Sequence, residues 1–288
     1  MLQASDQAAT LRAWAQQRTN VPMRARNTDA AASRVVAIGG GKGGVGKTVF
    51  CANLACALGN DGARVLAVDA DLGLCNLDFA LGTAARHSVS DVLGGDVAIE
   101  EALVDAAPNV KLLAGPTGKV DMADLAALER QRLTDAVARV DGHFDVVLVD
   151  MASGIGDNVM HFARAAERVV AVATPDPCSL TDAYTFIKAL RVHCGIKEVH
   201  FVANMVRNEG DGERLYGRLA ALAERFIGVD LRYLGALACD RAVPDSVRRR
   251  RPFVLASPDA KASQNLGAIV HRLRLAHGLP ALAPGELA

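Results

Sequence analysis

Short apolar runs rich in Val, Leu and Ala alternate with longer amphipathic stretches between residues 34 and 275. Runs that are almost continuously apolar are typical of strands buried on both faces, as in a parallel sheet covered by helices. We therefore expect strands at Arg34–Gly39, Arg64–Asp69, Val110–Gly115, Phe144–Asp150, Arg168–Thr174, Glu198–Asn204 and Leu231–Leu237.

The amphipathic stretches between these runs are long enough to be helices. They predict helices at Thr48–Leu58, Arg130–Val140, Leu180–Val192, Glu213–Arg225 and Ala260–Leu275. Such repeated alternation predicts an α/β fold with a doubly wound, mainly parallel sheet and helices on both faces. Because ligands of these folds bind beyond the carboxyl ends of the strands, the residues that end each run are the candidate site residues.

The two ends of the chain differ in composition from the middle. Residues 1–33 are polar and Ala-rich, and residues 276–288 are interrupted by Gly and Pro. We expect one domain over residues 34–275, preceded by a partner-binding helical segment (1–20) and a linker (21–33). Residues 276–288 are expected to be a flexible tail.

Composition narrows the class of protein further. With 51% hydrophobic and 22% charged residues, the chain has enough apolar side chains to form a core. Lys plus Arg and Asp plus Glu both number 32, which gives no support for a dedicated nucleic-acid binder. No uncharged apolar run approaches the roughly 18 residues of a spanning helix, and the first residues lack a secretory signal pattern. We expect a cytoplasmic protein with reduced cysteines.

A glycine-rich loop follows the first predicted strand and precedes the first predicted helix. Its sequence G-K-G-G-V-G-K-T satisfies the phosphate-loop pattern G-x-x-x-x-G-K-[ST] in the required context. Its backbone amides and the start of the helix would bind phosphate groups, Lys47 would reach the β- and γ-phosphates, and Thr48 would ligate Mg²⁺. The predicted ATP ligands here are Gly41, Lys42, Gly43, Gly44, Val45, Gly46, Lys47 and Thr48.

Carboxylates end two of the other predicted strands. Asp69 and Asp71 lie at the end of the second strand, and Asp150 ends the hydrophobic run F-D-V-V-L-V-D. Carboxylates at this edge can hold Mg²⁺ through water or orient an attacking water. We therefore expect Asp69, Asp71 and Asp150, together with Thr48, to form the metal site. The small residues of Met151–Gly156 predict a second loop that senses the γ-phosphate.

The K-G-G-V-G-K-T loop and the D-A-D-L-G segment together resemble the deviant Walker A ATPases, a family that includes MinD, ParA and the flagellar regulator FlhG. The resemblance implies an ATP-bound homodimer in which Lys42 reaches the partner subunit's phosphates, as an arginine finger does. It also implies that Asp71 acts in hydrolysis, that Asp69 lies in the outer shell of the metal, and that Asn204 binds the adenine edge.

The beginning of the chain narrows the resemblance to one branch. The segment D-Q-A-A-T-L-R resembles the N-terminal segment of the FlhG (FleN/YlxH) group, which docks on the GTPase FlhF and stimulates it. The implied partner-binding residues are Asp6, Gln7, Ala8, Leu11 and Arg12. Flagellar switch-ring proteins and a flagellar transcription activator are the other implied partners. The implied output is the number and placement of flagella.

Two other functions fit the same motifs. A MinD- or ParA-type ATPase would act on division sites or DNA, and a regulatory binding module would use ATP to hold a dimer together without hydrolysing it. An iron–sulfur relative is disfavoured because paired cluster cysteines are not evident.

Membrane binding is less well supported by the sequence. Several members of the resembled family end in a basic amphipathic helix, which would place them peripherally at the inner membrane or the cell pole. Here Ala276–Pro284 contains no Lys or Arg and is broken by Gly and Pro. The dense charge run Arg248–Arg251 is typical of a solvated helix face.

Overall fold

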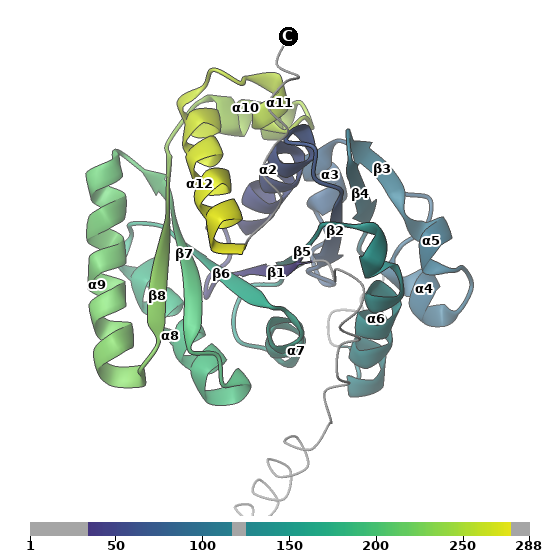
Figure 1. The fold of residues 1–288 in the computed structure, drawn as a ribbon, viewed down its shortest axis with the longest axis horizontal. Coiled ribbons are helices and arrows are strands. Elements are labelled where there is room, and N and C mark those ends of the chain that lie inside the picture. Colours follow the sequence, from purple (N-terminus) through teal and green to yellow (C-terminus); the bar gives the residue numbers. More distant parts are fainter. Residues whose placement is uncertain (1–33, 117–124, 278–288) are drawn as a thin grey trace, which may run out of the picture. The chain divides into compact units, whose positions relative to one another are not determined.

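A computed structural model describes residues 34–116 and 125–277 of the chain. They contain an eight-stranded sheet with the order β3-β4-β2-β5-β1-β6-β7-β8 (Figure 1). Neighbouring strands are parallel throughout, except that β3 and β4 are antiparallel. The strands are β1 (Arg34–Gly39), β2 (Val65–Ala70), β3 (Val104–Ala107), β4 (Val110–Leu113), β5 (Val146–Met151), β6 (Arg168–Ala173), β7 (Glu198–Val206) and β8 (Asp230–Ala238).

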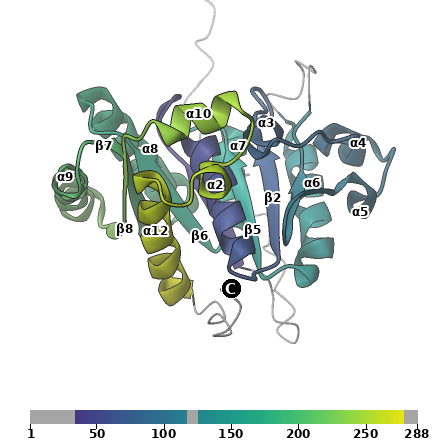
Figure 2. The ribbon, with the colours of Figure 1, turned by 90° about the horizontal axis from the view of Figure 1, so that it is seen from above.

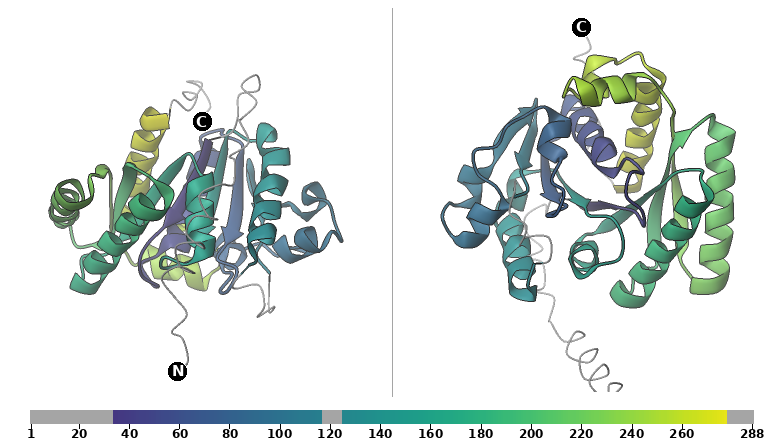
Figure 3. Two further views of the ribbon diagram at one scale, coloured as in Figure 1. Left: turned by 90° about the horizontal axis from the view of Figure 1, so that it is seen from below. Right: turned by 180° about the vertical axis from the view of Figure 1, so that it is seen from behind.

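Helices cover both faces of this sheet, as the alternation of runs predicts. On one face lie α2 (Lys47–Asn60), α3 (Leu77–Leu81), α10 (Ala242–Arg248), α11 (Phe253–Ala256) and α12 (Lys261–His277), and Figure 2 shows α2 and α12 side by side. On the other face lie α4 (Val89–Gly94), α5 (Ile99–Ala102), α6 (Ala127–Val140), α7 (Asp157–Ala165), α8 (Pro177–Cys194) and α9 (Glu209–Ile227) (Figure 3). A 3-10 turn, η2 (Asp141–His143), follows α6.

The core is divided by the sheet into two layers. Along β1, Val36 and Ile38 pack with α2 and α12, whereas Ala37 faces the layer that contains α6 and α8. Every residue of β2 and of β5 is buried. Two-sided burial explains why these strands read as continuous apolar runs rather than as alternating ones.

All of the predicted strands are present, and the predicted fold class is confirmed. The elements that the sequence analysis did not predict are short: the antiparallel edge strand β3, and the helices α3, α4, α5, α7, α10 and α11. Helices of four to nine residues complete too few turns for an apolar face to repeat, so periodicity does not reveal them.

Two further expectations concern the ends and the surface of the chain. The predicted segments 1–20 and 21–33, and the tail from residue 278, lie outside the described residues, so the domain boundaries stay predictions. Among residues 34–116 and 125–277, no helix combines the length and the apolar character that crossing a membrane requires.

The arginine run at Arg248–Arg251 lies at the end of α10 and is exposed. Arg248 pairs with Asp245 at 3.0 Å, and the guanidinium of Arg250 lies 4.6 Å from the centre of the Phe79 ring. Both contacts are within the chain, and a solvated helix face stays a prediction for this run.

Candidate nucleotide site

The phosphate loop connects the end of β1 to the start of α2 at the carboxyl edge of the sheet. Gly46 is the N-cap of α2 and has a left-handed backbone with φ of 88°. Among the described residues no side chain caps it, and the first turn of α2 contains no acidic residue. The amides and the positive end of the helix are therefore available to an anion, as the loop pattern predicts.

Close packing also requires glycine within this loop. A Cβ on Gly41 would lie 1.9 Å from the carbonyl oxygen of Asp182 in α8. The backbone of the loop therefore lies directly against this helix, and any larger residue at position 41 would displace the loop from α8. Gly41 thus has a packing role in addition to the phosphate contact predicted for it.

Lys47 begins α2 and lies inside the site, with only 6% of its surface exposed. Its ammonium donates a hydrogen bond of 2.5 Å to the Ser153 hydroxyl in the loop after β5. Burial lowers the pKa of Lys47, and the nearby charges of Asp150 and Asp71 oppose that shift. An ammonium with few protein partners in a dry position can bind phosphate oxygens without first losing many waters.

The loop after β5 lies against the phosphate loop. Besides Ser153, which receives the Lys47 hydrogen bond, the amide of Gly154 donates to the carbonyl of Gly40 at 3.0 Å. Lys47 and Ser153 are 106 residues apart in the sequence. The structure thus brings the predicted Met151–Gly156 loop to the end of Lys47 where a terminal phosphate would lie.

Asp150 is a buried carboxylate at the end of β5. Neither of its oxygens makes a hydrogen bond of good geometry with the described residues. Burial raises its pKa to about 7, although the neighbouring Thr48 hydroxyl and the Lys47 charge lower it. Buried carboxylates are normally paired, so these oxygens indicate a missing polar or cationic partner. The observation fits a Mg²⁺ ion or its bound waters.

Asp69 lies beside Asp150, because the two residues are in register on the parallel strands β2 and β5. It is also buried, and burial together with the Asp150 charge raises its pKa well above the usual range. Its oxygens are already occupied: they accept hydrogen bonds from the amides of Asp71 and Leu77, each at 3.1 Å. Asp69 therefore fixes the loop that carries Asp71.

Asp71 lies partly exposed at the start of that loop, where its charge raises the pKa of Lys47. One of its oxygens accepts a hydrogen bond from the Leu74 amide at 3.3 Å. The predicted residues Asp71 and Asp150 thus lie near enough to Lys47 for their charges to raise its pKa, and Thr48 lies beside Asp150. Their side chains alone would not hold a metal ion, since the described residues contain no cluster of three or more His, Cys, Asp or Glu that could do so. A Mg²⁺ ion here would need phosphate oxygens as further ligands.

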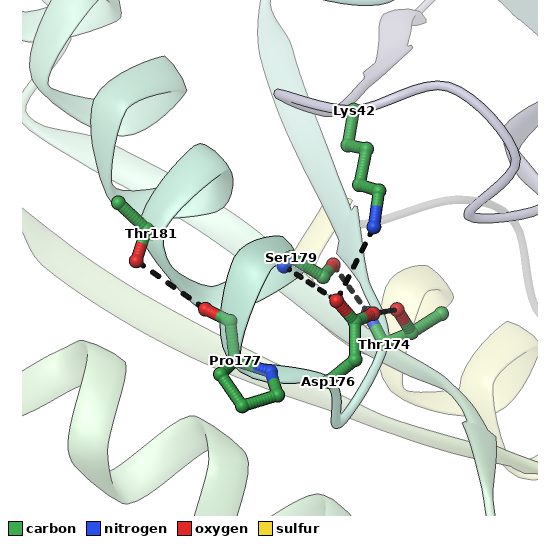
Figure 4. A network of polar contacts seen from close by, with 6 residues as sticks. All are labelled: Lys42, Thr174, Asp176, Pro177, Ser179 and Thr181. Atoms are coloured by element: carbon green, nitrogen blue, oxygen red, sulfur yellow. Dashed lines mark hydrogen bonds and ion pairs between the residues drawn. The ribbon is translucent and has the colours of Figure 1, made fainter.

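Lys42 lies on the open side of the loop and makes a different contact (Figure 4). Its ammonium lies 3.3 Å from Oδ1 of Asp176, and both side chains are more than two-fifths exposed. Asp176 is the N-cap of α8: it accepts hydrogen bonds from the Ser179 amide at 2.9 Å and the Thr174 hydroxyl at 2.5 Å. These hydrogen bonds, together with Lys42, lower the pKa of Asp176 to about 2.

Asn204 lies at the end of β7 and contacts the phosphate loop directly. Its amide nitrogen donates to the Val45 carbonyl at 2.8 Å, and its amide oxygen accepts from the Met205 amide at 2.9 Å. One further amide hydrogen and one lone pair are left for a ligand. Binding of the adenine edge by Asn204 stays a prediction.

Two contact residues were not predicted individually. Ser153 lies within the loop that the sequence analysis indicated, whereas Asp176 is not among the predicted site residues. The D-P-x-S sequence at Asp176–Ser179 is a helix start signal that could have located it. The predicted partner residues Asp6, Gln7, Ala8, Leu11 and Arg12 lie outside the described residues.

Comparisons with known proteins identify the family of the chain. The AAA domain family matches residues 33–195. The antiactivator FleN of Pseudomonas aeruginosa is 36% identical over 254 residues, which cover 88% of this chain and 90% of FleN. The flagellum site-determining protein YlxH of Helicobacter pylori is 33% identical over 238 residues, which cover 82% of this chain and 80% of YlxH.

Solved structures of the same family have a similar fold. The septum site-determining protein MinD of Pyrococcus horikoshii, complexed with Mg-ADP, matches with a TM-score of 0.72 and 27% identity. The match covers 85% of this chain and 98% of that one. Sequence, fold and site therefore lead to one assignment: the chain belongs to the AAA-domain family of MinD- and ParA-like P-loop ATPases, in the group that contains FleN and YlxH.

Proposed function

We propose that this chain is a switch ATPase that regulates the number and placement of flagella. The proposal is supported by the similarity to FleN and YlxH over most of the chain. The observation that carries the ATPase part is the buried Asp150 beside Lys47 at the phosphate loop, whose oxygens have no hydrogen bond of good geometry within the described residues. That arrangement is what a bound Mg–nucleotide would complete.

The predicted phosphate-binding and metal-site residues each have a role in this proposal. The loop from Gly41 to Thr48 binds the phosphates, and Thr48 and Asp150 hold Mg²⁺, directly or through water. When bound, Mg²⁺ neutralises phosphate charge. Asp71 orients the attacking water, and Asp69 holds the loop that carries Asp71 in place.

The switch itself is a homodimer that forms with ATP. In the isolated subunit Lys42 pairs with the exposed Asp176. In the dimer Lys42 leaves Asp176 and reaches the partner subunit's phosphates, so that hydrolysis is weak until two subunits meet. Hydrolysis then separates the subunits, and the nucleotide state decides which proteins bind.

Size measurement with ADP and with ATP tests the switch. We expect a monomer with ADP and a dimer with ATP for the wild type, and a persistent ATP dimer for Asp71→Ala. Lys42→Ala should stay monomeric with ATP. A wild type that stays monomeric under all conditions would contradict the proposed role of Lys42.

The FlhF-type GTPase, the switch-ring proteins and the transcription activator are the proposed partners. Deleting residues 1–20 tests the first of them, because residues Asp6–Arg12 lie in that segment. The deletion should abolish stimulation of the GTPase and leave ATP-dependent dimerisation unchanged. Unchanged stimulation would favour a MinD- or ParA-type function, for which salt-sensitive binding to random DNA is the distinguishing measurement.

A regulatory module that binds ATP without hydrolysing it is the second candidate. It is favoured by one observation: an exposed Lys42 could hold a dimer together without any chemistry. Single-turnover cleavage of ATP by the wild type and by Asp71→Ala separates the two candidates. Cleavage that is present in the wild type and lost in the variant supports the switch ATPase.

A further inference from the structure

Arg130, near the start of α6, is a largely buried arginine outside the nucleotide site. Only 11% of its side chain is exposed, and its guanidinium donates to the Leu125 carbonyl at 2.5 Å and to Asn158 Oδ1 at 3.1 Å. A second guanidinium nitrogen lies 4.0 Å from a carboxylate oxygen of Asp157. Desolvating a guanidinium is costly, and these contacts offset that cost. One side chain thus ties the start of α6 to the first turn of α7.

A second contact joins the same two helices one turn further along each. The Thr134 hydroxyl donates to the Arg130 carbonyl at 3.0 Å and lies 3.0 Å from Nε2 of His161. Burial and the charges of Arg130 and Arg164 lower the pKa of His161 to about 4, so its ring is neutral near pH 7. Because a hydroxyl has one hydrogen to donate, Nε2 carries the ring proton and donates to Thr134. Contacts at two consecutive turns therefore fix α7 on α6.

The first turn of α7 is also where the loop after β5 ends. Ser153 in this loop accepts the Lys47 hydrogen bond at 2.5 Å. Only Gly154, Ile155 and Gly156 separate Ser153 from α7, and Ile155 is 48% exposed. Two glycines and an exposed side chain restrain a loop poorly. The position of Ser153 therefore depends on where α7 begins.

We propose that Arg130 is a positioning residue that keeps Ser153 against Lys47 by fixing the start of α7. It acts through Asn158 rather than on the phosphates. The terminal phosphate of ATP meets the loop after β5 beside Lys47, so a displaced loop loses a contact that ADP, which lacks this phosphate, never makes. This inference rests on the proposed function, in which ATP binds with its terminal phosphate at that loop.

The test compares a triphosphate with a diphosphate. Affinities for ADP and for a non-hydrolysable ATP analogue are measured with Mg²⁺ for the wild type and for Arg130→Met, which keeps a long side chain but has no N–H donors. The variant should bind the analogue about three- to tenfold more weakly, the loss expected for about one hydrogen bond. Its affinity for ADP should be unchanged. Arg132→Met, which removes an exposed arginine from the same helix, is the matched control and should change neither affinity.

A double-mutant cycle shows whether Arg130 acts through Asn158. Asn158→Ala, which keeps the arginine in α6, should weaken binding of the analogue to a similar extent and leave ADP binding unchanged. The double variant should bind the analogue no more weakly than either single variant, because both changes release the same contact. Losses that multiply in the double variant would mean that the two residues act separately, and would overturn the inference.

The comparison with ADP separates positioning from a purely structural role. Equal weakening of ADP and of the analogue in Arg130→Met would mean that Arg130 only stabilises the fold, and would overturn the inference. An unchanged affinity for the analogue would also overturn it and would leave the proposed function intact. A wild type that binds ADP and the analogue equally well would show no recognition of the terminal phosphate and would contradict both.

Discussion

The two lysines of the phosphate loop lie five residues apart and have opposite surroundings. Lys47 is 6% exposed, lies beside three polar groups of the site, and has its pKa lowered by burial. The side chain of Lys42 is 43% exposed and is held by one ion pair to Asp176. The comparison teaches that one loop carries a buried charge, enclosed by the protein, and an exposed charge that a single surface ion pair holds.

The physical difference is the cost of moving each side chain. An exposed ion pair at 3.3 Å is weak and screened by salt, so Lys42 leaves it with little loss of free energy. Lys47 is enclosed by the loop after β5 and cannot leave without uncovering buried carboxylates. The sequence alone places both lysines in the motif, and only the fold distinguishes them.

The largest expected effect is on turnover when Lys42 is removed. Lys42→Ala should lower ATP hydrolysis about 10³-fold, because a charge supplied by a partner subunit acts on the transition state. ATP affinity of the monomer should change less than about threefold, since Lys42 pairs with Asp176 rather than with the site. Steady-state hydrolysis and nucleotide titration measure the two quantities. If Lys42→Ala lost ATP affinity and turnover to the same extent, Lys42 would act in binding as Lys47 does, and the proposed difference between the two lysines would be wrong.

Replacing Lys47 should act on binding instead. Lys47→Ala should weaken ATP binding about 100-fold, because two charge-assisted hydrogen bonds to phosphate are lost. Lys188→Ala, on the exposed side of α8, controls for loss of one positive charge and should leave affinity unchanged. Isothermal titration gives both values, and an intact affinity in Lys47→Ala would contradict the site as described.

The stability of the nucleotide-free chain should depend on pH, because Asp150, beside Lys47, is a buried carboxylate. Burial raises the pKa of Asp150 to about 7, above the unfolded value of 3.8, so the folded chain binds the proton more tightly. Stability from this group is therefore greatest below pH 3.8 and falls as pH rises toward 7. Asp150→Asn should be about 1–3 kcal/mol more stable than the wild type at pH 7, and this gain should shrink as the pH falls toward 4.

Urea unfolding at several pH values measures this difference. Adding Mg²⁺ and ATP should favour the wild type again, because the carboxylate then has its partner. A variant that is equally destabilised at every pH would mean that Asp150 is not the group responsible.

The smallest expected effect comes from releasing Lys42. Asp176→Asn keeps a good N-cap for α8, because Asn and Asp cap helices about equally well, but it removes the ion pair. ATP-dependent dimerisation should become about two- to fivefold tighter, in line with a weak surface pair. Sedimentation at graded protein concentrations measures this, with Asp182→Asn on the same helix as the control. Weaker dimerisation would show that Asp176 acts in the dimer rather than against it.

Much of the fold could be predicted because buried parallel strands leave continuous apolar runs, as β5 does with V-V-L-V-D. The phosphate loop could be predicted because its glycines and Lys47 follow from backbone geometry at one local turn. Asp69 and Asp150 look alike in the sequence, since each ends a buried strand. Their difference appears only when Leu77 folds back to hydrogen-bond Asp69, which no local pattern indicates.

The contacts of Lys42 and Val45 that could not be predicted from the sequence join residues far apart in the chain. Asp176 lies 134 positions from Lys42, and Asn204 lies 159 positions from Val45. The Met205 carbonyl accepts a hydrogen bond from Cys239, which follows β8 and is positioned by the pairing of β7 with β8. Such contacts are products of topology, so single-sequence patterns identify the participants but not the pairs.

Asp69 has one further consequence for how the site works. Its two oxygens accept hydrogen bonds from the amides at both ends of the segment from Asp71 to Leu77, and so hold both ends in place. The conformational entropy of this segment is therefore given up when the chain folds, and an arriving ligand does not have to order it. Asp71, the carboxylate proposed to act in hydrolysis, is thereby held in place before any substrate is present.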